Sequence, residues 1–231
     1  YKKMHMLPPV HRAGYPFIVA GAGVTLVLLL LAPFAGLLAA IVTAWIIYFF
    51  RDPVRVVVED DSLILSPADG RIQSVTQAGP PTEIAQDTDG ETWTRISIFL
   101  DIFDVHVNRL PCNGTIDKRV YHKGQFLNAA MDKASEKNER NSLVIARPDG
   151  AHIYVVQIAG LIARRIVCDI DEGATSVAGR RFGMIRFGSR VDIYLPEGFT
   201  PSVAEGQRAV GGETVLAEQG TLNQGLQIRR E

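Results

Sequence analysis

The chain has 231 residues, of which 47% are hydrophobic, and its formal net charge is −1. The length suits one domain of ordinary size plus an appendage, and the near-neutral charge excludes the broad cationic surface that nucleic-acid binding needs. The two cysteines, Cys112 and Cys168, form no CxxC motif and no metal-ligand cluster, so we expect reduced thiols and no metal site.

The first element is a long apolar segment, residues 16–50, that contains no charged residue. It exceeds the roughly 20 residues that span a bilayer, and a secretory signal would have an apolar region of only about 7–15 residues. Pro33 divides it into halves of about 17 residues, each about 25 Å long as a helix. Basic residues flank both ends, which favours both ends on the cytoplasmic side. We therefore predict a membrane-anchoring helical hairpin within residues 1–52, with one long tilted helix as the alternative.

Residues 53–231 predict a mainly β domain, because short β-rich runs alternate with turn signals. The strongest signal is a hairpin around the turn Arg147-Pro-Asp-Gly150. Residues 128–138 favour a short helix. Residues 203–217 resemble the hairpin of biotinyl/lipoyl-like barrel-sandwich domains without the carrier lysine, so we expect a barrel-sandwich-like fold. Strands are expected at residues 54–58, 63–65, 72–75, 95–100, 115–121, 143–146, 152–159, 161–167 and 190–195.

The pair Gly188-Ser189, just before an alternating strand, carries the main chemical hypothesis. Glycine can adopt a positive φ, which would let the Ser189 hydroxyl attack the carbonyl carbon of Gly188 and cleave the chain there. The alternative is an ordinary Gly-Ser turn. His106 and Asp69 supply a base and an orienting carboxylate for this serine. Triads are defined by geometry and not by order in the chain, so the sequence permits this set without proving it.

Other chemistries lack their motifs in this sequence. There is no Gly-x-Ser-x-Gly elbow, which disfavours an α/β-hydrolase, and no His-Glu-x-x-His pair, which disfavours a zinc hydrolase. No Walker A or Rossmann glycine pattern is present, so nucleotide binding is not indicated.

Five motifs follow one another along the chain. The apolar segment ends in Tyr-Phe-Phe-Arg-Asp-Pro53, and then come Ser-Pro-Ala-Asp-Gly70, Asp-Val-His-Val-Asn-Arg-Leu-Pro-Cys-Asn-Gly114, Asn-Glu-Arg-Asn141 and Phe-Gly-Ser189. Together they resemble the phosphatidylserine decarboxylase family in its short bacterial form. The resemblance runs from about residue 45 to residue 217.

The resemblance implies a proenzyme that cleaves itself between Gly188 and Ser189 by an N-to-O acyl shift and β-elimination. A β chain, residues 1–188, and an α chain, residues 189–231, would remain together as a heterodimer; a homodimer is left open. Ser189 would become a pyruvoyl cofactor, which forms a Schiff base with phosphatidylserine in the membrane and acts as the electron sink when carbon dioxide leaves. The product would be phosphatidylethanolamine. The implied enzyme is a carboxy-lyase at the cytoplasmic face of the inner (cell) membrane.

By the matching motifs, Asp69 would orient His106, and His106 would act as base for Ser189 and later return a proton to the carbanion. Longer relatives carry a second histidine three residues after the first, where this chain has Arg109, so His122 is an alternative for one of these roles. His122, Arg140 and Asn141 are candidate substrate-binding residues. The further arginine candidates for the lipid phosphate or carboxylate are Arg51, Arg55, Arg109, Arg186 and Arg190.

Two other hypotheses stay open at the level of sequence. The first is a membrane-tethered barrel-sandwich adaptor without catalysis, in which the bond between Gly188 and Ser189 stays intact. The second is a pyruvoyl-dependent decarboxylase of a soluble amino acid. The apolar segment disfavours the second hypothesis, because a small amino acid needs no membrane dock.

Overall fold

A computed structural model of the chain describes residues 8–85, 93–125, 138–160, 165–186 and 188–220. The chain forms two compact units. The helical unit comprises Tyr1–Val54 with Phe103–Val105, and the β unit comprises Arg55–Ile102 with His106–Glu231.

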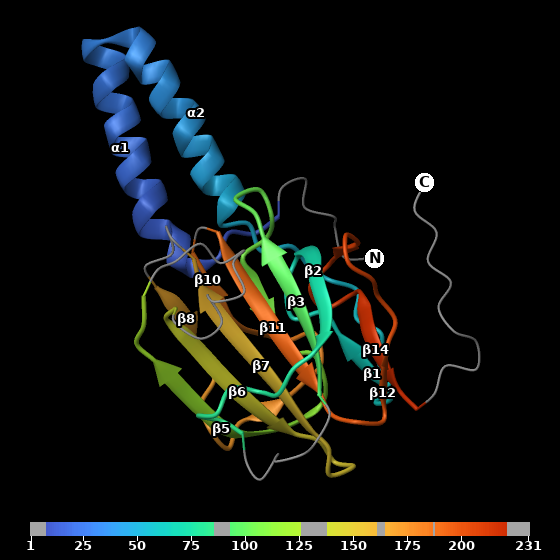
Figure 1. The fold of residues 1–231 in the computed structure, drawn as a ribbon. Coiled ribbons are helices and arrows are strands. Elements are labelled where there is room, and N and C mark those ends of the chain that lie inside the picture. Colours follow the sequence, from blue (N-terminus) through green and yellow to red (C-terminus); the bar gives the residue numbers. More distant parts are fainter. Residues whose placement is uncertain (1–7, 86–92, 126–137, 161–164, 187, 221–231) are drawn as a thin grey trace. The chain divides into compact units, whose positions relative to one another are not determined.

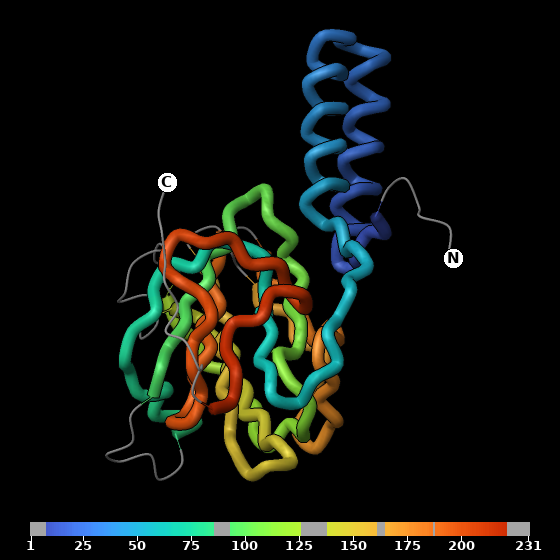
Figure 2. Tube along the Cα trace, turned by 90° about the vertical axis from the view of Figure 1, so that its right-hand side faces the viewer, coloured from blue at the N-terminus to red at the C-terminus, as the bar shows by residue number. Residues whose placement is uncertain are grey.

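The helical unit is built on two antiparallel helices, α1 (Tyr15–Leu31) and α2 (Pro33–Phe49), after a 3-10 turn at Arg12–Gly14. The helices run side by side along their length (Figures 1 and 2). Ala32 leaves the helical conformation, with φ −151° and ψ 82°, because the residue before a proline is disfavoured in the α region. Pro33 then opens α2, where its missing N–H has no cost. The predicted helical hairpin with a break at Pro33 is confirmed.

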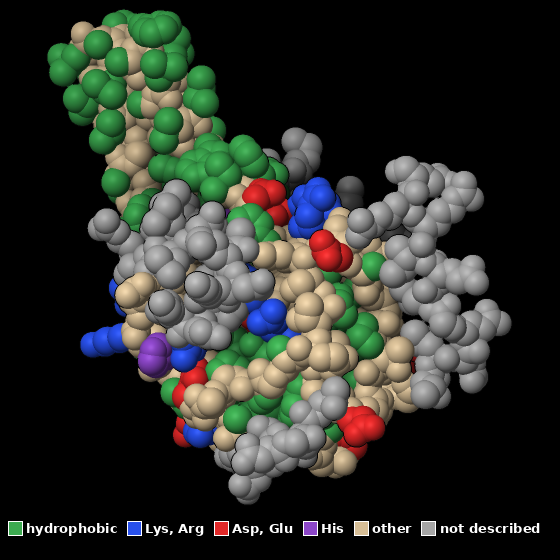
Figure 3. All heavy atoms as spheres, viewed as in Figure 1, with side chains coloured by type: hydrophobic (Ala, Val, Ile, Leu, Met, Phe, Trp, Pro, Cys, Tyr) green, Lys and Arg blue, Asp and Glu red, His purple; other side chains and the backbone are tan. Residues whose placement is uncertain are grey.

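Both helices expose many apolar side chains. The space-filling view shows those on one side (Figure 3). Leu30, Leu31 and Phe34 are 76–79% exposed near the helix-to-helix turn. Arg12–Leu31 is 20 residues long and contains an 18-residue stretch with a mean hydropathy of 2.1, so it is long and apolar enough to cross a membrane. Pro33–Phe49 is a shorter apolar helix. A helix that is apolar all round is stable only when an apolar environment covers it.

The β unit confirms the prediction of a mainly β domain. Its largest sheet has the strand order β13-β2-β3-β11-β7-β6-β5-β9 and curls into a half-barrel (Figure 1). Two three-stranded sheets, β1-β14-β12 and β4-β10-β8, accompany it. The strands are β1 (Leu63–Leu65), β2 (Gly70–Gln77), β3 (Thr94–Leu100), β4 (Val107–Arg109), β5 (Gly114–His122), β6 (Arg140–Ala146), β7 (His152–Ala159), β8 (Ile166–Cys168), β9 (Thr175–Ser176), β10 (Arg181–Ile185), β11 (Ser189–Leu195), β12 (Phe199–Pro201), β13 (Arg208–Ala209) and β14 (Val215–Gln219).

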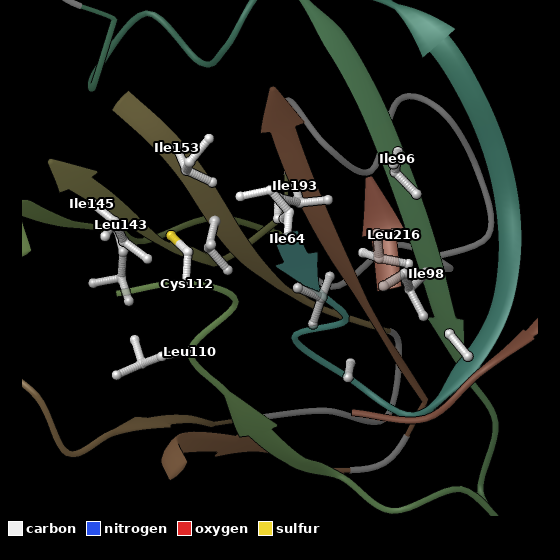
Figure 4. Close-up of a cluster of buried hydrophobic side chains, with 14 of the residues drawn as sticks. Ile64, Ile96, Ile98, Leu110, Cys112, Leu143, Ile145, Ile153, Ile193 and Leu216 are labelled. Carbon is white, nitrogen blue, oxygen red and sulfur yellow. The ribbon is translucent and has the colours of Figure 1, made fainter. Parts of the chain in front are cut away.

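Strand β11 lies in the middle of the large sheet and pairs antiparallel with β3 and β7. Its side chains alternate between the two faces, as the period of a strand requires. Val191, Ile193 and Leu195 enter the main core, which fills the inside of the curled sheet (Figure 4). Tyr194 packs on the outer face in a second cluster that includes Trp93. Ser189, two residues before Val191, therefore belongs to the inner face.

The core also holds Cys112, which is buried, and burial raises the pKa of its thiol to about 12. Cys168 is partly buried, and both cysteines are free thiols. The hairpin predicted around Arg147 is confirmed: β6 pairs with β7, and the Arg147 amide donates to the Ala151 carbonyl at 2.9 Å.

One predicted strand, residues 54–58, is wrong. These residues lie in no strand ladder, although their exposure alternates. Val54 and Val56 are 81% and 82% exposed, and the Val56 amide donates to a Glu213 carboxylate oxygen at 3.1 Å. The Glu213 side chain therefore accepts a backbone hydrogen bond that a neighbouring strand would otherwise accept.

The local hairpin expected at residues 203–217 is also wrong. Its two strands pair elsewhere: β13 joins β2, while β14 joins β1 and β12 in another sheet. Of the strand expected at residues 161–167, only Ile166–Cys168 is a described strand, and residues 161–164 lie outside the described residues. The short helix expected at residues 128–138 falls almost wholly on residues 126–137, which also lie outside them.

Candidate active site around Ser189

Gly188 has the backbone conformation that self-cleavage was predicted to use. Its φ is +63°, in the left-handed region that favours glycine. Chain neighbours apart, a Cβ built on Gly188 would find no heavy atom of the described residues within 4 Å. Ser189 begins β11 and is paired with Leu100 on one side and Ala159 on the other.

The Ser189 hydroxyl is the most unusual group in this region. The residue is completely buried, and its Oγ has no hydrogen-bond partner among the described residues. A buried hydroxyl without a partner costs about 1–3 kcal/mol, and such groups in native proteins call for an explanation. The hydroxyl belongs to the residue that directly follows Gly188.

His106 is completely buried and immediately precedes β4. Its carbonyl accepts a hydrogen bond from the Ile185 amide at 3.3 Å, and Val107 pairs with Met184 in the β4–β10 ladder. The fold thus holds the His106 backbone against the strand that leads directly to Gly188. In the uncut chain the Ser189 Oγ does not bond to His106 or to any other described residue.

Asp69 occupies the turn before β2, and its carboxylate has other partners. Arg55 donates to its two oxygens at 2.7 and 2.9 Å, and the Gly211 amide donates at 2.8 Å. Within the described part of the chain, His106 is not among its hydrogen-bond partners. The Arg109 amide donates to the Pro67 carbonyl at 2.9 Å, which holds this turn beside β4. The fold therefore brings the segments of Asp69 and His106 together, while the role of Asp69 stays a prediction.

The three candidate substrate-binding residues lie on two neighbouring strands but point differently. His122 ends β5 opposite Arg140, the first residue of β6. Arg140 lies on the outer face and pairs with Glu83 at 2.5 and 3.0 Å. Burial raises the pKa of Glu83, but the hydrogen bond and the charge of Arg140, together with smaller contributions, hold the pKa below its ordinary value. Asn141 turns to the inner face and donates to Gln157 at 2.9 Å.

Most of the other arginine candidates already serve internal contacts. Arg190 and Asp192 are completely buried on the outer face of β11 and form a bidentate ion pair at 2.6 and 2.7 Å. The remaining contacts are Arg51 on the Tyr48 ring and the Phe103 carbonyl, Arg55 on Asp69, and Arg109 on the Gly179 carbonyl. Burial lowers the pKa of Arg186, two residues before Gly188, and so does the neighbouring charge of Arg165.

Sequence reasoning missed a buried row of amide side chains on the inner face. Asn141 donates to Gln157 at 2.9 Å, and Gln157 donates to Asn108 at 2.8 Å. All three residues are completely buried. Two signals could have indicated them: Asn108 lies two residues after His106, and Gln157 interrupts an otherwise apolar run in β7.

A comparison of the sequence with known protein families identifies the class to which this protein belongs. Residues 42–217 match the model of the family described as phosphatidylserine decarboxylase, and this range includes Asp69, His106 and Ser189. The chain belongs to the phosphatidylserine decarboxylase family. The resemblance carried by the five motifs is therefore confirmed.

Individual relatives agree with this assignment over nearly the whole chain. The phosphatidylserine decarboxylase proenzyme of Cereibacter sphaeroides is 51% identical over 212 residues, covering 92% of this chain and 90% of the relative. The phosphatidylserine decarboxylase proenzyme of Granulibacter bethesdensis is 52% identical over 216 residues, covering 94% of this chain and 87% of the relative.

Proposed function

We propose that this chain is a proenzyme that cleaves itself between Gly188 and Ser189 and then acts on lipid at a membrane surface. As a carboxy-lyase of its family it converts phosphatidylserine to phosphatidylethanolamine and carbon dioxide. One observation carries the self-cleavage: a buried hydroxyl that has no partner in the described part of the chain directly follows a glycine at φ +63°.

The first step takes place within the chain itself. The Ser189 Oγ adds to the Gly188 carbonyl carbon and, as the peptide C–N bond breaks, an ester replaces the amide. The positive φ of Gly188 supports this approach. β-Elimination of the ester then separates residues 1–188 from residues 189–231, which stay associated as a heterodimer.

The surroundings of Ser189 also fit a pyruvoyl group at the start of the α chain. Ladder pairing with Leu100 and Ala159 holds the residue on both sides, and the apolar core lies beneath it. When present, a pyruvoyl group supplies an electron sink for the loss of carbon dioxide from a substrate amine. The residues of this chain bind the substrate, exclude water and move protons around that position.

We assign the base for Ser189 to His106, which the β4–β10 ladder holds beside the segment leading to Gly188. His106 also serves as proton donor after carbon dioxide leaves, with His122 as the alternative for one of the two roles. Asp69 orients His106 in this scheme. For that role the Asp69 carboxylate must release the guanidinium of Arg55 and accept a hydrogen bond from the imidazole of His106 instead.

Arg186 is one candidate for binding the anionic head group. Burial and the charge of Arg165 both disfavour the charged guanidinium, so a phosphate or carboxylate at this position would relieve the repulsion. Arg140 is the weaker candidate, because Glu83 already neutralises it. Asn141 and His122 remain candidates for polar contacts to the head group.

We place the protein at the cytoplasmic face of the inner (cell) membrane. The exposed apolar helices of the helical unit support an anchor, and the basic residues that flank them support the cytoplasmic orientation. A relationship to biotinyl/lipoyl-like barrel-sandwich domains is part of this proposal and is supported by the curled sheet. A homodimer is left open.

The test compares wild type with Ser189→Ala on vesicles that contain phosphatidylserine and on free serine. Wild type should release carbon dioxide and form phosphatidylethanolamine from the vesicles alone, and Ser189→Ala should do neither. Activity on free serine but not on vesicles would instead support the decarboxylase of a soluble amino acid. An inactive wild type with an intact chain would support the adaptor.

A further inference from the structure

A row of side-chain hydrogen bonds crosses the inner face of the large sheet and ends in an unused donor. The Arg119 Nε donates to the Asn141 Oδ1 at 3.3 Å, the Asn141 Nδ2 to the Gln157 Oε1 at 2.9 Å, and the Gln157 Nε2 to the Asn108 Oδ1 at 2.8 Å. The Asn108 Nδ2 is buried and has no hydrogen-bond partner among the described residues. The row therefore stops at a donor without an acceptor.

The cation at the start of the row sets the direction of every amide in it. Arginine carries only donors, so Asn141 must present its oxygen to Arg119 and its nitrogen to Gln157. The same argument then turns the oxygen of Gln157 toward Asn141 and the oxygen of Asn108 toward Gln157. Reversing any one amide would bring two donors or two acceptors together. The open group on Asn108 is therefore the NH₂, polarised through aligned hydrogen bonds that begin at a positive charge.

The open donor belongs to the surroundings of Ser189. Gln157 lies directly opposite Val191 in the β7–β11 ladder, and Ser189 is the next residue on that face of β11. Such diagonal neighbours lie about 7–8 Å apart, within reach of long side chains. Gly183 of β10 pairs with Asn108, and a Cβ built on it would come within 3.2 Å of the Gln157 Nε2. The row of amides therefore lies against β10, the strand that precedes Gly188 in the chain.

We infer that the Asn108 Nδ2 is the hydrogen-bond donor that stabilises the negative charge on the Gly188 carbonyl oxygen during self-cleavage. This inference rests on the proposed function. As the bond from the Ser189 Oγ to the carbonyl carbon forms, the π electrons move to the carbonyl oxygen and the hydroxyl proton passes to His106. The carbonyl then re-forms, the C–N bond breaks, and the Ser189 nitrogen takes that proton back. No external reactant is needed.

A donor without a partner in the uncut chain suits this task. An oxyanion donor accelerates a reaction only if it binds the transition state more strongly than the ground state. Among the described residues the Asn108 Nδ2 has no hydrogen bond to give up when the charge develops, and a buried donor interacts with that charge more strongly than one in water. Arg119, Asn141 and Gln157 are positioning residues that hold and polarise the Asn108 amide.

The test measures the rate of self-cleavage of the full-length chain after a pulse of cell-free synthesis, followed on gels. Removing one oxyanion donor slows an acyl transfer about 10²–10³-fold, and we expect this slowing for Asn108→Ala. Gln157→Leu should fall between Asn108→Ala and wild type. Asn113→Ala, which removes an amide that bonds to Asp61 and Ala178, is the matched control and should cleave at the wild-type rate.

Two further measurements separate the donor from a merely structural role. Asn108→Asp keeps an oxygen for Gln157 but replaces the donor, so it should cleave as slowly as Asn108→Ala; recovery of the wild-type rate would overturn the inference. Hydroxylamine, which cleaves esters, should not restore cleavage of Asn108→Ala, because the ester has not formed. Restoration would show that the donor acts at a later step and would also overturn it.

Folding is checked by thermal unfolding of the same variants in a Ser189→Ala chain. If wild type cleaves and a folded Asn108→Ala chain cleaves equally fast, the inference is wrong while the proposed function stands. If wild type itself does not cleave, the proposed function fails first. Normal cleavage of Asn108→Ala with loss of lipid decarboxylation would assign the donor to the substrate and overturn the inference.

Discussion

The two faces of strand β11 differ in whether their buried polar side chains have partners. On the outer face, Arg190 and Asp192 are completely buried, and their opposite charges form a bidentate ion pair at 2.6 and 2.7 Å. On the inner face, the adjacent Ser189 is equally buried, but its hydroxyl has no partner among the described residues. Strand β11 thus pairs its two buried charges and leaves a buried hydroxyl without a hydrogen-bond partner in the described part of the chain.

This difference indicates which face carries chemistry. An unpaired buried charge would cost several kcal/mol, so pairing the two charges matters more for stability than pairing a hydroxyl. An unpaired hydroxyl costs about 1–3 kcal/mol, which a stable domain can tolerate where function requires it. We therefore expect substitutions on the inner face to change self-cleavage and substitutions on the outer face to change stability.

The largest effect should come from Ser189→Ala. We expect no cleavage and an unfolding free energy equal to or above that of the uncut wild-type chain, because the alanine removes an unsatisfied hydroxyl. Gels and urea unfolding measure the two effects. Ser176→Ala is the matched control: its buried hydroxyl donates to the Cys112 carbonyl at 2.7 Å, so it should lose about 1 kcal/mol and still cleave. A marked loss of stability in Ser189→Ala would break the comparison.

His106→Ala should slow self-cleavage by about 10²–10⁴-fold, the usual contribution of a general base. His122→Ala should cleave at the wild-type rate if His106 alone serves maturation. Rates after cell-free synthesis check both variants. Normal processing of His106→Ala would assign the base to another residue.

Asp192→Ala should destabilise the chain by about 3–5 kcal/mol, because it leaves the buried charge of Arg190 uncompensated. Denaturant unfolding in a Ser189→Ala chain measures this loss without interference from cleavage. Asp171→Ala removes a carboxylate that is 90% exposed beside Arg119 and should cost less than about 1 kcal/mol. Equal effects of the two substitutions would contradict the assigned role of the outer face.

Gly188→Ala should cost about 1–2 kcal/mol and slow cleavage, because an alanine at φ +63° is strained. Chain neighbours apart, no heavy atom of the described residues lies within 4 Å of the added Cβ, so the strain comes from the backbone alone. Gly79→Ala, where the space is equally open and φ is ordinary, should be nearly neutral. Urea unfolding and the cleavage assay would reveal an unexpected tolerance at Gly188.

The smallest effect concerns Asp149, a partly exposed partner of Arg147. The hydrogen bond from Arg147 holds the pKa of Asp149 below its ordinary value of 3.8. The contribution to stability is therefore complete above pH 3.8 and is lost as the pH falls below it through the lower folded value. Asp149→Asn should remove this part of the acid dependence, by less than about 1 kcal/mol in urea unfolding. An unchanged acid profile would show that the pair contributes nothing.

Local signals in the sequence predicted the elements that depend on neighbouring residues. Pro33 within a charge-free segment predicted two helices, and the turn Arg147-Pro-Asp-Gly150 predicted the β6–β7 hairpin. Gly188 before a strand predicted the positive φ. Each of these features is decided within a few residues, where backbone sterics and turn chemistry dominate.

Features that need distant segments could not be predicted. The pairing of β13 and β14 with different sheets depends on topology, and so does the contact between Arg55 and Asp69. The unsatisfied Ser189 hydroxyl and the row that ends at Asn108 arise only where several strands meet. A motif in one segment does not show which hydrogen-bond acceptors the segments packed against it provide.

The most direct test of the account is the mass of the purified wild-type protein. We predict two fragments, residues 1–188 and residues 189–231, with the shorter one blocked by a pyruvoyl group at its amino end. An intact chain in a preparation that is active on phosphatidylserine, or a free unmodified amino group on Ser189, would contradict the account.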